Sequence, residues 1–135
     1  MSKRLWTMAL AVPLTAATVL AVAPAASASG GNVDSGGVRT SGGCSGATTW
    51  KMKAKSDNGR LEGELEIDSN RVGQTWAVNM KDNGSTVFTG NRLTKAPSGS
   101  FTVHQLTANR AGVDHFVGTA RNAASGETCT ARVNI

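Results

Sequence analysis

The stretch "WKMKAKSDNGRLEGELEID", residues 50–68, decides the fold of the chain. On both sides of Asn58-Gly59, apolar and charged residues alternate strictly, which predicts two β-strands with one buried face each. Asn-Gly favours a two-residue type I′ turn, because both central positions of that turn adopt positive φ. The apolar pairs that then face each other are Trp50–Ile67 and Met52–Leu65. We therefore expect a tight β-hairpin whose apolar face lies in the core.

The polar face of this hairpin carries a row of lysines opposite a row of glutamates. The facing pairs in the expected register are Lys51–Glu66, Lys53–Glu64 and Lys55–Glu62. A loop longer by one residue would set Lys51 opposite Leu65 and bury charge, so the alternation excludes it. Each pair of opposite charges across two strands contributes roughly 0.2–1 kcal/mol. We call these six residues the charged comb, and two interpretations of it stay open: a solvated ladder, or an interaction face.

The tripeptide Asp-Asn-Gly recurs in "NMKDNGSTVF", residues 79–88. A two-residue loop at this second site would place Val78 opposite Thr89. A three-residue loop with Gly84 in a bulge would align Val78 with Phe88 instead. We expect the three-residue loop, because it pairs apolar side chains.

The rest of the chain after Cys44 also alternates, and no ten-residue stretch keeps the 3.6-residue period of a helix. The later strands are expected at Phe101–Thr107, Asp114–Arg121 and Thr128–Asn134. Together with the two hairpins these make seven short antiparallel strands. Seven such strands with turn signals between them predict an all-β domain, a two-sheet β-sandwich over residues 44–135.

The N-terminal 43 residues precede this domain. In residues 1–28, Lys3 and Arg4 come before a long apolar run that ends at Ala26-Ser27-Ala28, which is typical of a signal peptide. Residues 29–43, "SGGNVDSGGVRTSGG", are rich in glycine and serine and are expected to form a flexible tether. We expect a secreted, extracellular protein that has no membrane segment once the signal peptide is removed.

Two cysteines, Cys44 and Cys129, lie near the two ends of the expected domain. An exported chain with one pair of cysteines predicts a disulfide between them. In the entropic model, closing a loop of this length stabilises the fold by at most about 4.5 kcal/mol. A metal pair or a reactive thiol are the rival interpretations, but no histidine lies near either cysteine at the spacing of a metal site.

The segment "NRAGVDHFVGTARNAASGETC", residues 109–129, resembles the last two strands of immunoglobulin and fibronectin type III domains. Trp76 in "GQTWAV" lies on the third strand, where immunoglobulin-like domains keep a buried Trp. Gly118 stands where that family has its inter-sheet cysteine, and Phe116 stands at the tyrosine-corner position. The resemblance therefore implies a variant immunoglobulin-like sandwich that is joined near its ends through Cys44 and Cys129.

The whole chain also resembles small secreted proteins of actinobacteria, with similar tether, "APSGSF" (96–101) and "SGETC" (125–129) segments. This resemblance implies a bacterial extracellular protein and carries no activity.

The composition argues against several classes of function. Removing residues 1–28 leaves 12 basic and 9 acidic residues, spread along the chain, which is unlike a nucleic-acid-binding face. His104 and His115, the two histidines, fall on different strands, and no nucleophile motif frames any serine. The row of Glu62, Glu64, Glu66 and Asp68 lacks EF-hand spacing and faces lysines. We expect no enzyme activity, no cofactor and no metal.

Two hypotheses of function remain. The first is a non-catalytic interaction module that binds an extracellular protein or a cell-wall polymer, with the charged comb as the candidate face. The second is a carbohydrate-binding module that reads sugars with exposed Trp50 and Trp76. Both tryptophans lie on the apolar side of alternating strands, which favours the core for them.

Overall fold

The computed structural model describes residues 32–34 and 36–135, so the expected signal peptide lies outside the described residues. In this part of the chain no helix is long and apolar enough to cross a membrane. The described residues form nine β-strands: β1 (Asn32–Asp34), β2 (Gly37–Gly43), β3 (Thr49–Asp57), β4 (Arg60–Asp68), β5 (Thr75–Asp82), β6 (Ser85–Leu93), β7 (Ser100–Ala108), β8 (His115–Asn122) and β9 (Thr128–Asn134).

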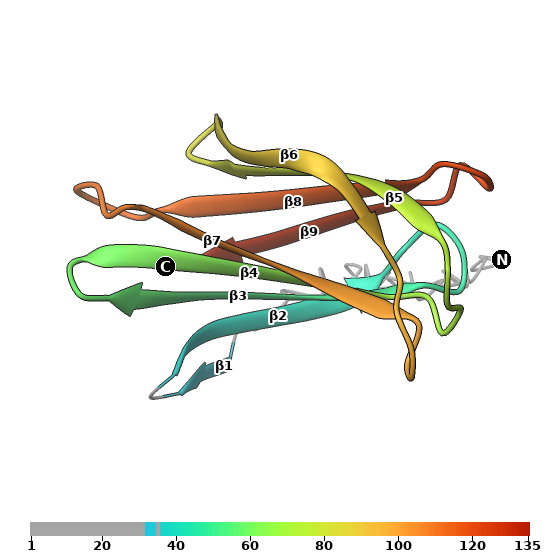
Figure 1. The fold of residues 1–135 in the computed structure, drawn as a ribbon. Helices are drawn as coiled ribbons and strands as arrows, with labels where there is room; N and C mark the ends of the chain where they lie inside the picture. Colours follow the sequence, from blue (N-terminus) through green and yellow to red (C-terminus); the bar gives the residue numbers. More distant parts are fainter. Residues whose placement is uncertain (1–31, 35) are drawn as a thin grey trace, which may run out of the picture.

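The strands form two antiparallel sheets that stack face to face (Figure 1). One sheet has five strands in the order β1-β2-β3-β4-β7, and the other has four in the order β6-β5-β8-β9. The expected all-β sandwich is therefore confirmed, with two strands more than the seven expected.

The two additional strands come from the expected tether, so that interpretation is wrong for residues 37–43. β2 pairs with β3 from Val38–Ala54 to Gly43–Thr49 and covers an edge that would otherwise be open. Gly42 serves close packing, because a Cβ there would lie 2.7 Å from the Trp50 ring. A glycine-rich composition is typical of a flexible segment, whereas here a glycine lets a strand lie against a large side chain.

The register of the first hairpin is confirmed. All three comb pairs and the Trp50–Ile67 and Met52–Leu65 pairs face each other as expected. Asn58 and Gly59 both have positive φ, 49° and 76°, as a type I′ turn requires.

The expectation for the second hairpin is wrong. Asp82 pairs with Ser85, so the loop has two residues, Asn83 and Gly84, both with positive φ. A register shift follows at Met80/Lys81, which sets Met80 opposite Phe88 and Val78 opposite Gly90. The bulge lies within the strands and not in the loop, because Asn-Gly keeps its preference for the same tight turn.

The side chain of Asn83 also ties this turn to the start of β8. Its amide donates to Asp114 Oδ1 (2.7 Å), and its Oδ1 accepts from the backbone N–H of His115 (2.9 Å). These contacts join residues 31 and 32 positions apart, so the local pattern of apolar residues does not predict them.

The core fills the space between the sheets and is built from the inward positions of both. Trp76 and Phe116 are its largest fully buried side chains. Gly63 in β4 leaves room for the Phe116 ring, since a Cβ there would lie 2.8 Å from it. Gly118 in β8 likewise lies against Leu65, at 2.8 Å from a built Cβ. These two glycines let the sheets approach each other.

The disulfide between Cys44 and Cys129 is present and joins the end of β2 to β9. Glu127 holds the same region: its carboxylate accepts from the backbone N–H of Gly46 and from both the N–H and the hydroxyl of Thr48. One covalent bond and a shared carboxylate thus connect the two sheets at this end of the sandwich.

Asp82 and Asp114 are buried carboxylates at the opposite end, close to the second hairpin turn. Asp82 Oδ2 accepts from Thr107 Oγ1 (3.2 Å), whereas its buried Oδ1 has no hydrogen-bond partner among the described residues. Desolvation raises the pKa of Asp82; the Thr107 hydrogen bond lowers it, and the neighbouring Asp114 raises it further.

We predict that Gly63→Ala destabilises the fold by about 1–3 kcal/mol, because the new methyl group would overlap a buried aromatic ring. The matched control is Gly43→Ala, where a Cβ meets nothing within 4 Å. Urea unfolding measures both variants. Equal stability of the two variants would contradict the close approach of the sheets at Gly63.

We predict that Asp82→Asn becomes more stable relative to the unchanged protein as the pH rises. The raised pKa means that the folded state holds a proton more tightly than the unfolded state does. The stability due to Asp82 is full below its ordinary pKa and is lost as the pH rises through the raised value. The free energy of unfolding of Asp82→Asn minus that of the unchanged protein should therefore increase across this window in urea titrations. A difference that stays constant with pH would overturn the assignment.

Candidate functional site

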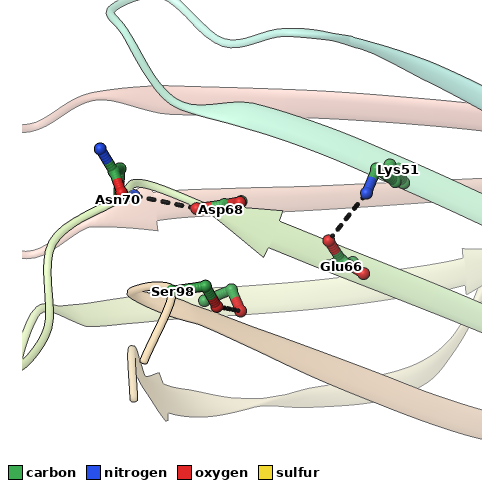
Figure 2. Close-up of polar contacts among 6 residues, drawn as sticks. Lys51, Glu66, Asp68, Asn70 and Ser98 are labelled. Carbon is green, nitrogen blue, oxygen red and sulfur yellow. Dashed lines mark hydrogen bonds and ion pairs between the residues drawn. The ribbon is translucent and has the colours of Figure 1, made fainter. Parts of the chain in front are cut away.

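The outer face of the five-stranded sheet carries the charged comb, as the alternation predicts. Lys51 Nζ lies 3.3 Å from Glu66 Oε1, and Lys55 Nζ lies 3.6 Å from Glu62 Oε1. Figure 2 shows the Lys51–Glu66 pair bridging β3 and β4, next to the turn where the Asn70 N–H donates to Asp68 Oδ1. Such exposed pairs contribute little, about 0–1 kcal/mol each. The outward orientation of the comb is confirmed, and its role as an interaction face stays a prediction.

His104 joins this face from β7, which sequence reasoning missed. β7 pairs with β4 and sets His104 directly opposite Glu64. His104 Nδ1 lies 3.5 Å from Glu64 Oε2 and 3.8 Å from Glu62 Oε1. The chain separates β4 from β7 by a whole hairpin, so no local pattern indicates this neighbourhood.

The outer face of the four-stranded sheet is hollowed, and this hollow was not anticipated either. It has a volume of about 560 Å³ and is lined by residues of β5, β6, β8 and β9. Two cross-strand rows of outward residues form it: Thr89–Asn79–Thr119–Thr130 and Asn91–Ala77–Arg121–Thr128. We call it the polar hollow. The signal for it in the sequence is the run of small polar residues at alternate positions, which also fits an ordinary solvated face.

The polar hollow offers hydrogen-bonding groups and one positive charge. Threonine hydroxyls donate and accept, and asparagine amides do both through separate atoms. Arg121 adds a guanidinium within one row, between Ala77 and Thr128. Among the described residues that line the hollow, none carries a carboxylate.

Trp50 and Trp76 have different surroundings. Trp76 is 0% exposed, so its expected place in the core is confirmed. Trp50 is half-buried: it packs against the core and also lines a groove of about 500 Å³ together with Arg132 and Asn134. The Trp50 ring N–H donates to the carbonyl of Gly43 (3.2 Å). Of the tryptophans in the described part of the chain, only Trp50 therefore has a face near solvent.

No family model, no curated protein and no solved structure matches the chain.

Proposed function

We propose that this protein is a secreted, non-catalytic binding module of the extracellular space and that its ligand is an anionic, hydroxyl-rich polymer of the cell wall. The observation that carries this proposal is the polar hollow, about 560 Å³ in volume, on the outer face of the four-stranded sheet.

The chemistry of the hollow fits a sugar-containing polymer. Hydroxyl groups of a glycan both donate and accept, as do the threonine and asparagine side chains of the two rows. Arg121 suits a carboxylate or phosphate on the same polymer, because a guanidinium binds such groups in a bidentate way. Since the hollow lies on the outside of the sheet and residues of all four strands line it, a long chain can cross it without its ends entering.

Secretion has separate support. A disulfide persists in oxidising compartments and is rare in a reducing cytosol. The pattern of residues 1–28 favours an exported precursor.

An immunoglobulin-like relationship is part of the same proposal. The strand order supports it, because β3-β4-β7 facing β6-β5-β8-β9 is how strands A, B and E face C′, C, F and G in such domains. β1 and β2 would then be additions at the edge of strand A.

In this proposal the sugar is not recognised by stacking on an exposed tryptophan. Trp76 is enclosed by the core and has no face to offer a sugar ring. Trp50 has a partly open face, but it lies beside the groove between β2 and β9 and not in the polar hollow. We therefore assign recognition to hydrogen bonds and to Arg121.

The test is binding of the purified oxidised protein to the wall fraction and to the exported proteins of the producing cells. Arg121→Gln should weaken retention on purified anionic wall polymer at least about tenfold, because a hydrogen bond to a charged group contributes about 1.5–3 kcal/mol. Thr119→Val, which keeps the shape and removes the hydroxyl, should weaken retention less. Lys53→Gln, on the opposite sheet, is the matched control and should leave retention unchanged.

Three outcomes would contradict the proposal. The first is retention by exported proteins and not by wall polymer. The second is an equal loss for Lys53→Gln and Arg121→Gln. The third is a loss on changing Trp50→Ala with none on changing Arg121→Gln, which would place sugar binding at the tryptophan.

A further inference from the structure

We propose that Glu62, Glu64 and His104 form a binding site for one divalent transition-metal ion of the zinc class on the outer face of the five-stranded sheet. This site lies on the other sheet from the polar hollow and is independent of the proposed polymer binding. It revises the expectation that the histidines have no part in metal binding.

The three side chains bring their ligand atoms together. One carboxylate oxygen from each glutamate and a ring nitrogen of His104 all lie within 4.8 Å of one another. His104 Nδ1 is 3.5 Å from Glu64 Oε2 and 3.8 Å from Glu62 Oε1. With zinc–ligand bonds of about 2.0–2.1 Å in a tetrahedron, neighbouring ligand atoms are about 3.3–3.4 Å apart. Small side-chain adjustments are therefore enough to close this set around an ion.

Strand register holds the three residues in place before any ion binds. Glu62 and Glu64 occupy alternate positions of β4 and so point to the same face. His104 is the cross-strand partner of Glu64 in β7. The glutamate side chains are only 21% and 30% exposed, whereas that of His104 is 60% exposed. The carboxylates are thus restrained by the sheet surface, and the open side leaves room for water as a further ligand.

The ligand types select the class of metal. An imidazole nitrogen with two carboxylates suits zinc and neighbouring transition metals. Calcium prefers six to eight oxygen ligands, and magnesium keeps an octahedral shell that is largely water. Because it includes the imidazole of His104, this group of residues has the ligand types of a zinc site, which a row of exposed glutamates alone does not have.

The positive charge of Lys55 disfavours binding of a metal ion at this site. Its ammonium lies 3.6 Å from Glu62 Oε1, the same atom that approaches His104. A bound metal would displace this ion pair, whose ammonium competes with the metal for the same carboxylate oxygen. Removing the lysine charge should therefore tighten metal binding, which a purely structural role of the glutamates would not cause.

The experiment is isothermal titration calorimetry of the untagged full chain with zinc chloride. We expect one equivalent of zinc to bind. His104→Gln and Glu64→Gln should each weaken binding at least about tenfold, because loss of even a supporting residue costs 10–100-fold at metal sites. His115→Gln, which changes the only other histidine, should leave the affinity unchanged, and Lys55→Met should increase it. Urea unfolding without metal checks that each variant is folded.

Absence of saturable zinc binding would overturn the proposal. So would an equal loss for His115→Gln and His104→Gln, since that would indicate non-specific binding to histidine. Displacement of zinc by an equal concentration of calcium would show that the carboxylates act alone, and would also overturn it.

Discussion

The register of the β3–β4 hairpin is the constraint on which the rest of the structure depends. Because side chains alternate across a strand, a slip of one residue would move the lysines of β3 into the core and the apolar residues out of it. Burying unpaired charges is far more costly than any gain from the ladder itself. The pairing of β4 with β7 sets the orientation of β7 in turn. Leu65 faces Val103 on the core side, and Glu64 faces His104 on the outer side. The core face of β4 also carries Gly63, which admits the ring of Phe116 from the opposite sheet.

The two sheets present different chemistry to solvent. The outer face of the five-stranded sheet is charged, and its pairs largely neutralise each other across β3, β4 and β7. The polar hollow on the other sheet holds hydroxyl and amide groups with a single guanidinium. The charged face suits a metal ion, and the polar hollow suits a polymer that forms many weak hydrogen bonds. We therefore assign the two proposed binding roles to separate faces.

Sequence reasoning succeeded where the pattern is local and strict. The first hairpin follows from one turn and two alternating segments, and the strand at Thr128–Asn134 was expected with the observed bounds. It failed where tertiary contacts decide. The bulge at Met80/Lys81 lies within the strands, the side chain of Asn83 bonds to the start of β8, and Gly42 of β2 lies against the Trp50 ring. His104 and the polar hollow arise from strands that are far apart in the chain, so only the sheet order reveals them.

Reversal of every charge in the comb tests the central claim most directly. The full exchange, with glutamate at 51, 53 and 55 and lysine at 62, 64 and 66, keeps every facing pair opposite in sign. The free energy of unfolding should then stay within about 1 kcal/mol of the original value. Reversing the three lysines alone sets like charges across the hairpin and should lower it by more. If the full exchange unfolds the domain, the register of β3 against β4 and the outward orientation of the comb are both wrong.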